Sequence, residues 1–297
     1  MTPNSGSGNA PSAFVEPKLE DVAVGDLVFR TRIAGEGDRL VLLLHGFPQT
    51  SWMWRHVLPA LAAAGYRVAA PDQRGYSPGA RPEDVEEYGF AALTGDVAGL
   101  AAALGHDRFD VVGHDWGGAV AWGTAARFPD QVRSVTSVST PHSAALVEAM
   151  GAPSGDQANK SSYMSLFGAE KGKAEAVLLS GGADGLRGVY ESWGLGTEDD
   201  DDVEAYVRAL SDEPTLSAAL NWYRRGFEWA AVEPVEVPAL YVWGTEDVAL
   251  GREAAELTEK YVGGPYRFVV LDGVDHWVAE HAGDRLIAEL TAHLAAT

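Results

Sequence analysis

Apolar runs and stretches of helical periodicity follow one another along most of the chain. The run Leu40–Leu44 is apolar throughout, which is typical of a strand buried on both faces of a sheet. Farther along, Leu93, Val97 and Leu100 recur at helical spacing. Eight strands are predicted, at residues 21–24, 27–31, 40–44, 66–70, 109–113, 132–138, 238–243 and 266–271. Strands that alternate with helices predict an α/β fold with a mostly parallel eight-stranded sheet and helices on both faces.

The alternation is interrupted once, after Pro141. Residues 143–232 have a helical but irregular pattern, and we predict that they form an inserted helical cap. Residues 19–142 and 233–297 then form the sheet-bearing core. Because ligands of open α/β sheets bind at the carboxyl ends of the strands, such a cap would roof the binding site. The polar residues 1–18 are predicted to be a disordered leader.

Composition narrows the classes of partner. The chain has a formal net charge of −21, which repels phosphate backbones and anionic lipid surfaces, so we expect no nucleic-acid or membrane partner. It contains no cysteine, no recognisable secretion signal and no apolar run long enough to cross a bilayer. These features predict a cytoplasmic protein, monomeric or homodimeric, whose ligand is a neutral small molecule.

The segment after the strand at 109–113 has the pattern of a nucleophile elbow. Gly113-His114-Asp115-Trp116-Gly117 matches the G-x-S-x-G turn with an aspartate in the position of the serine. The small residues leave room for a strained turn that presents Asp115 beside a helix N-terminus. The alternative is that Asp115 is an ordinary helix N-cap after a buried strand.

Two later strand ends supply partners for Asp115 in the chain order nucleophile, acid, histidine. Asp247 follows the strand at 238–243, and His276 follows the strand at 266–271. His276 would act as a base that Asp247 orients, with Glu246 as the competing acid. The alternative for His276 is a surface turn.

The loop His45-Gly46-Phe47-Pro48 follows the strand at 40–44 and completes the candidate site. In this architecture the oxyanion hole takes one N–H from this loop and one from the residue after the nucleophile. We therefore predict the backbone N–H groups of Phe47 and Trp116 as its donors. The alternative is that Gly46 and Pro48 only form a structural turn. A structural turn and an oxyanion-hole loop are compatible with each other.

With these motifs, residues 22–294 resemble the α/β-hydrolase superfamily. The segments His45–Pro48 and Gly113–Gly118 are similar to those of its epoxide hydrolase and haloalkane dehalogenase branch, whose members use an aspartate nucleophile. Esterases and lipases of the same fold need a serine at that position. The resemblance implies attack of the Asp115 carboxylate on carbon, followed by hydrolysis of the resulting enzyme ester.

Epoxide hydrolases similar to this chain carry two cap tyrosines that donate to the epoxide oxygen. By resemblance these are Tyr223, in Asn221–Arg225, and Tyr163, in Ser162–Phe167. The alternative is that such aromatic residues form the apolar face of a cap helix. The resemblance favours an epoxide hydrolase that needs no cofactor and no metal.

Two other functions stay open. In haloalkane dehalogenases the indole after the nucleophile holds the halide, which Trp116 would allow, but their usual second donor is an asparagine where this chain has Phe47. A non-catalytic binding protein on this fold is the third possibility. Further residues are expected to line the substrate pocket: His45, Pro48, Trp116, His142, Trp222 and Trp277. The acidic run at 198–202 lacks the spacing of a calcium loop and is predicted to be a solvated cap loop.

Overall fold

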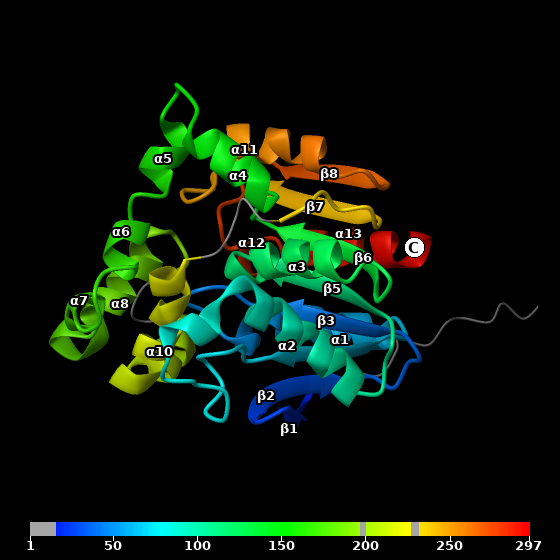
Figure 1. Cartoon of the computed structure of the whole chain (residues 1–297), viewed down its shortest axis with the longest axis horizontal. Helices are drawn as coiled ribbons and strands as arrows, with labels where there is room; N and C mark the ends of the chain where they lie inside the picture. The colour runs from blue at the N-terminus through cyan, green and yellow to red at the C-terminus, as the bar shows by residue number, and fades with distance from the viewer. Residues whose placement is uncertain (1–15, 197–199, 227–231) are drawn as a thin grey trace, which may run out of the picture.

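The computed structural model describes residues 16–196, 200–226 and 232–297. Its centre is an eight-stranded sheet in the order β1-β2-β4-β3-β5-β6-β7-β8 (Figure 1). The strands are β1 (Lys18–Val24), β2 (Leu27–Ala34), β3 (Leu40–Leu44), β4 (Arg67–Pro71), β5 (Phe109–His114), β6 (Val132–Val138), β7 (Ala239–Gly244) and β8 (Tyr266–Leu271). β2 pairs antiparallel with β1 and β4, and all other pairs are parallel. The predicted mostly parallel sheet is confirmed.

Burial along the strands follows the hydrophobic pattern. Every residue of β3, β5 and β7 is buried, whereas the edge strands β1 and β8 expose part of their residues. The predicted disordered leader, residues 1–18, is wrong at residue 18, because Lys18 is the first residue of β1 and pairs with Ile33. Residues 1–15 of that predicted leader lie outside the described residues.

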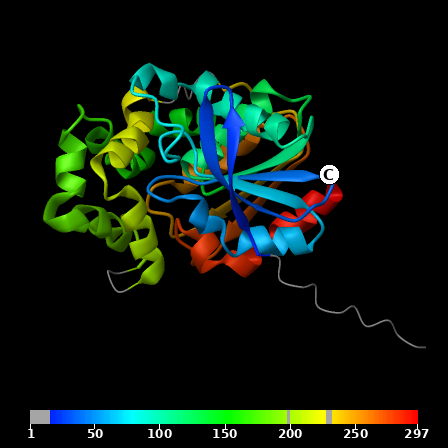
Figure 2. The same cartoon turned by 90° about the horizontal axis from the view of Figure 1, so that it is seen from below.

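Helices cover both faces of the sheet (Figure 2). One face carries α1 (Val57–Ala63) and α13 (Gly283–Ala296), and the other carries α2 (Phe90–Ala103) and α3 (Trp116–Arg127). Before α1, the chain forms the 3₁₀ turn Ser51–Trp54, which is capped by the Thr50 side chain. Four further elements among the described residues belong to this part: the 3₁₀ turn Val85–Tyr88, α11 (Arg252–Leu257), the 3₁₀ turn Thr258–Tyr261 and α12 (Val278–His281).

A helical insertion lies between β6 and β7, at one end of the sheet (Figure 1). Its helices are α5 (Asp156–Lys160), α6 (Met164–Phe167), α7 (Lys173–Leu178), α8 (Ser180–Ser192), α9 (Asp201–Leu210) and α10 (Glu213–Arg225). The preceding α4 (Ser143–Met150) packs against α11 through a small apolar cluster that includes Leu146, Ala149 and Ala254. The domain boundaries at residues 143 and 232 stay predictions.

Polar side chains join the insertion to the core. The Tyr190 hydroxyl donates to the Pro48 carbonyl at 2.7 Å, and the Trp222 indole donates to the Arg74 carbonyl at 2.8 Å. Asp202, in the acidic run, forms an ion pair with Arg55. Asp201 and Asp202 begin α9, and the Asp200 side chain caps this helix, so these three residues do not form the predicted solvated loop. Residues 198–199 of the run lie outside the described residues.

Within the described ranges, no helix is long and apolar enough to cross a membrane.

Candidate active site

Asp115 stands at the turn between β5 and α3 in a strained backbone conformation. Its φ of 52° and ψ of −123° are rare for a residue with a side chain. It occupies the N-cap position of α3, yet its carboxylate makes no capping hydrogen bond to that helix. The structure thus departs from the ordinary N-cap alternative and directs the carboxylate out of the sheet.

The glycines of the elbow are needed for close approach of the backbone. A Cβ atom on Gly113 would lie 1.9 Å from the Gly117 carbonyl oxygen, and one on Gly117 would lie 2.3 Å from the Leu44 carbonyl oxygen. Gly46 is equally restricted, because its Cβ atom would lie 2.3 Å from that of Asp115. Only glycine fits at these positions without moving backbone or the nucleophile.

Two backbone N–H groups face the Asp115 carboxylate. The Phe47 N–H donates to Oδ1 at 2.9 Å, and the neighbouring Trp116 N–H, like that of Phe47, lowers the pKa of the carboxyl group. These are the two groups that the sequence predicts as oxyanion-hole donors. Donors already aimed at this carboxyl group can stabilise negative charge that develops on it without reorganising.

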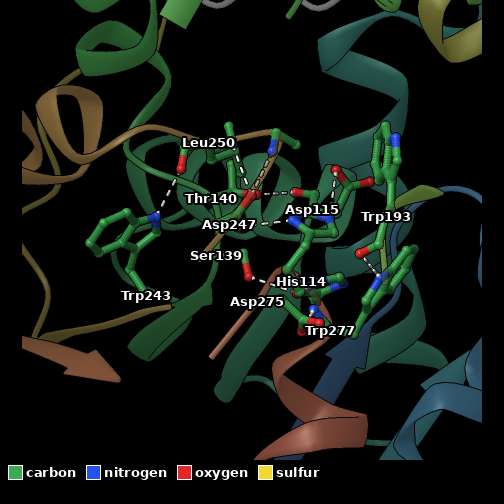
Figure 3. A network of polar contacts seen from close by, with 12 residues as sticks. His114, Asp115, Ser139, Thr140, Trp193, Trp243, Asp247, Leu250, Asp275 and Trp277 are labelled. Carbon is green, nitrogen blue, oxygen red and sulfur yellow. Dashed lines mark hydrogen bonds and ion pairs between the residues drawn. The ribbon is translucent and has the colours of Figure 1, made fainter. Parts of the chain in front are cut away.

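His276 lies between two carboxylates. Its Nδ1 contacts Asp247 Oδ2 at 2.9 Å, and its Nε2 lies 3.7 Å from Asp115 Oδ2. Nε2 makes no hydrogen bond with any of the described residues, so it is open toward the carboxylate of Asp115. Asp115, Asp247 and His114 belong to one polar network (Figure 3). The geometry meets the requirements of the predicted triad, in which Asp115 would be the nucleophile, His276 the base and Asp247 the acid that orients the base.

The choice between Asp247 and Glu246 is made by the loop after β7. Asp247 is buried and its Oδ1 accepts the N–H groups of Ala249 and Leu250 at 2.8 and 2.9 Å. These bonds leave Oδ2 for His276. Glu246 is exposed, whereas Asp247 is buried against His276.

Burial and charge set the protonation of the group. Burial raises the pKa of Asp115 above that of an ordinary carboxyl, against the opposing effects of His276 and the two N–H donors. Burial by itself lowers the pKa of His276, but the Asp247 carboxylate, with a smaller contribution from Asp115, raises it to about 9. At neutral pH the imidazole is therefore protonated as long as both carboxylates are charged.

A small cavity of ≈ 20 Å³, room for about one water molecule, adjoins Asp115 beneath the cap. Its lining residues are Asp115, Trp116, Thr140, Leu146, Ser161, Tyr163, Met164, Tyr223 and Leu250. Burial raises the pKa of both Tyr163 and Tyr223 well above that of a free phenol, so both remain proton donors at neutral pH. The structure thus brings both predicted cap tyrosines to the nucleophile.

Trp116 connects the elbow to one of these tyrosines. The rings of Trp116 and Tyr223 meet edge to face with their centroids 5.0 Å apart. Trp116 slightly lowers the pKa of the Tyr223 phenol, against the larger effect of burial, which raises it. The indole therefore contacts the cap.

Known proteins resemble this chain over most of its length. The alpha/beta hydrolase fold family matches residues 39–175. Epoxide hydrolase A of Mycobacterium tuberculosis is 33% identical to this chain over an alignment of 305 positions, gaps included. The alignment covers 88% of this chain and 92% of that protein. The AB hydrolase superfamily protein YfhM of Bacillus subtilis is also 33% identical, with the same coverage. The crystal structure of Epoxide Hydrolase A from Mycobacterium thermoresistibile superposes with a TM-score of 0.81 at 31% identity, covering 94% of this chain and 98% of the other.

The chain belongs to the epoxide hydrolase family.

This family member has the α/β-hydrolase fold that the resemblance predicted. Five of the residues expected to line the substrate pocket do not belong to the described lining of the cavity beside Asp115: His45, Pro48, His142, Trp222 and Trp277. Their polar groups have structural partners. The His45 ring accepts the Gln73 N–H at 3.0 Å, and the Trp277 indole donates to the Trp193 carbonyl at 2.8 Å. His142 stacks on Tyr261 and caps α4.

Sequence patterns missed several residues around the triad of this family member. Trp193, from the cap, meets the His276 ring at a right angle with centroids 5.7 Å apart, and it also contacts Tyr163. The His276 carbonyl accepts hydrogen bonds from His114 Nε2 at 2.8 Å and from the Ser139 hydroxyl at 3.1 Å. Burial lowers the pKa of His114 well below its usual value, which keeps it neutral. In the sequence, only the position of His114 directly before Asp115 indicates that it lies near the candidate site.

Proposed function

We propose that this protein hydrolyses an epoxide to a vicinal diol through a covalent ester on Asp115. The observation that carries the proposal is the juxtaposition of an aspartate nucleophile with two protonated tyrosines across one cavity. Membership of the epoxide hydrolase family supports the same reaction class. The cytoplasmic location, and a monomeric or dimeric state, stay predictions from the sequence.

In the first step, an Asp115 carboxylate oxygen attacks an epoxide carbon and the carbon–oxygen bond of the ring breaks. A phenol of Tyr223 or Tyr163 donates its proton to the departing ring oxygen, which is otherwise a poor leaving group. Ester formation removes the negative charge of Asp115, one of the groups that raise the pKa of His276. The imidazolium then loses its proton and the tyrosinate left by ring opening takes up one proton, so that the phenol and a neutral imidazole are present before the second step.

In the second step, neutral His276 takes a proton from water, and the hydroxide adds to the ester carbonyl carbon. The N–H groups of Phe47 and Trp116 stabilise the oxyanion that forms on Asp115. Collapse breaks the ester bond, and the leaving diol oxygen takes the proton back from the imidazolium. The new carboxyl group of Asp115 ionises and reprotonates His276, which regenerates the starting charges.

The site is less suited to the dehalogenase alternative. A halide needs two neutral donors, and the Trp116 indole, which packs edge to face against Tyr223, would supply one of them. Phe47 offers only its backbone N–H, which is bonded to Asp115. A non-catalytic binding protein would have no use for the charged alignment of Asp115, His276 and Asp247.

The test compares the wild-type protein with the Tyr223→Phe variant on styrene oxide and 1-bromobutane. We expect the wild type to form the diol from styrene oxide and to release no bromide. In Tyr223→Phe, ring opening should slow by about ten- to a hundredfold, because one proton donor is lost while Tyr163 remains. Diol is measured by chromatography and bromide by an ion-selective electrode.

The half-buried Tyr261 offers a matched control, because its ring stacks on His142 and its hydroxyl donates to Glu148, and it does not line the cavity beside Asp115. Tyr261→Phe should therefore retain wild-type diol formation. Bromide release without diol would show that the protein is a dehalogenase. Equal rates in the wild type and Tyr223→Phe would remove the role given to Tyr223.

A further inference from the structure

Ser161 is a polar residue in the cavity that the proposed reaction does not use. It follows α5 directly, two residues before Tyr163, and lines the cavity together with Asp115. Its side chain is buried. A buried hydroxyl at the wall of a reaction cavity requires an account of both its donor and its acceptor capacity.

The acceptor side of Ser161 is fixed by Gln157, one turn earlier. The Gln157 Nε2 group donates to Ser161 Oγ at 2.9 Å and to the Ala249 carbonyl at 2.9 Å. Gln157 Oε1 accepts the Gly251 N–H at 2.8 Å. With both ends of its amide engaged, the fully buried Gln157 is held in one orientation and presents an N–H to the serine.

The donor side of Ser161 is unassigned. No acceptor for its O–H is found among the described residues, and one lone pair is already occupied by Gln157. The other hydroxyls of the cavity have roles: Thr140 donates to the Asp115 carbonyl at 2.8 Å, and the two tyrosines are the proton donors of the proposed reaction. Ser161 is thus a positioned donor that lacks an acceptor within the described protein.

The lining of the cavity also includes the apolar side chains of Leu146, Met164 and Leu250. A fixed donor that has no acceptor in the described protein can recognise one acceptor atom of a ligand, while apolar lining residues contact its hydrocarbon part. We propose that Ser161 is a specificity-determining residue, and that the protein favours epoxides with an ether or ester oxygen near the ring over hydrocarbon epoxides of the same length. This inference rests on the proposed epoxide hydrolysis.

The experiment uses two substrates that differ only by an ether oxygen in place of a methylene group, butyl glycidyl ether and 1,2-epoxyoctane. The kcat/KM ratio of ether to hydrocarbon is measured for the wild type and for Ser161→Ala. Intrinsic differences in reactivity cancel when the two ratios are compared. Loss of one neutral hydrogen bond should lower the ratio by about three- to tenfold in the variant.

Three further variants separate a hydroxyl effect from a packing effect. Ser161→Thr keeps the hydroxyl and should keep most of the preference for the ether. Ser161→Val has nearly the shape of the threonine without the hydroxyl and should lose the preference. The exposed neighbour Ser162 provides the control, because Ser162→Ala should leave the ratio unchanged.

The outcomes for Ser161 and for the proposed function are distinguishable. If the wild type forms both diols and the ratio is the same in Ser161→Ala, or in the Thr and Val variants, the role of Ser161 is wrong while epoxide hydrolysis stands. If the wild type forms no diol from these or any other epoxide, the proposed function is wrong and this inference is overturned with it.

Discussion

Replacing His276 with glutamine should stop the reaction after ring opening and leave the substrate bound to the protein. The nucleophile, its N–H donors and the cap tyrosines remain, so the ester can form. The base that activates water is lost, and steady-state diol formation should fall by about 10²- to 10⁴-fold. Intact-protein mass spectrometry should show one added mass equal to that of the epoxide, located in the peptide that contains Asp115.

The assay is best performed at pH 8. The charge of His276 lowers the pKa of Asp115, so its removal raises that pKa further, and the carboxylate must stay ionised to attack. The exposed His56 provides the control, because His56→Gln should form diol at the wild-type rate and carry no adduct. A slow His276→Gln variant that never carries an adduct would contradict an ester intermediate that His276 helps to hydrolyse.

Replacing Asp115 with alanine should abolish turnover. The side chain is the only group that forms a bond to the substrate in the proposed reaction, and loss of such a nucleophile costs on the order of 10⁴-fold or more in rate. No covalent adduct should appear at any time. Diol formation is measured under single-turnover conditions, which detect slow residual reactions.

Glu246→Gln is a suitable control for the loss of a carboxylate. It removes one negative charge near the triad loop, but the side chain is exposed and the variant should form diol at nearly the wild-type rate. Diol formation by Asp115→Ala within about tenfold of the wild type would exclude Asp115 as the nucleophile.

The elements that depend on local pattern could be predicted from the sequence. The apolar runs located all eight strands, because central strands buried on both faces have continuous hydrophobic sequences. Gly113 and Gly117 were expected at the elbow for lack of space, and the distances of the added Cβ atoms agree. The strand ends also placed Asp115, Asp247 and His276 at one edge of the sheet, as chain order alone suggested.

The contacts between the cap and the candidate site could not be predicted from the sequence. Trp193 and Ser161 reach the site from an irregular helical insertion, where no periodic pattern shows which side faces the nucleophile. His45, Trp222 and Trp277 were expected in the pocket because of their nearness to motifs, but their hydrogen bonds to distant backbone groups hold them in structural positions. Such long-range pairings follow from packing of the whole chain.

The central claim is that the substrate becomes bonded to a carboxyl oxygen of Asp115 and that water later attacks the same carboxyl group. It is tested most directly by one turnover in ¹⁸O-labelled water with the enzyme in excess over an epoxide. The account predicts that ¹⁸O appears in the peptide containing Asp115, whereas the first diol released carries only unlabelled oxygen. Label in the first diol and none in the peptide would show direct hydration of the epoxide and contradict the account.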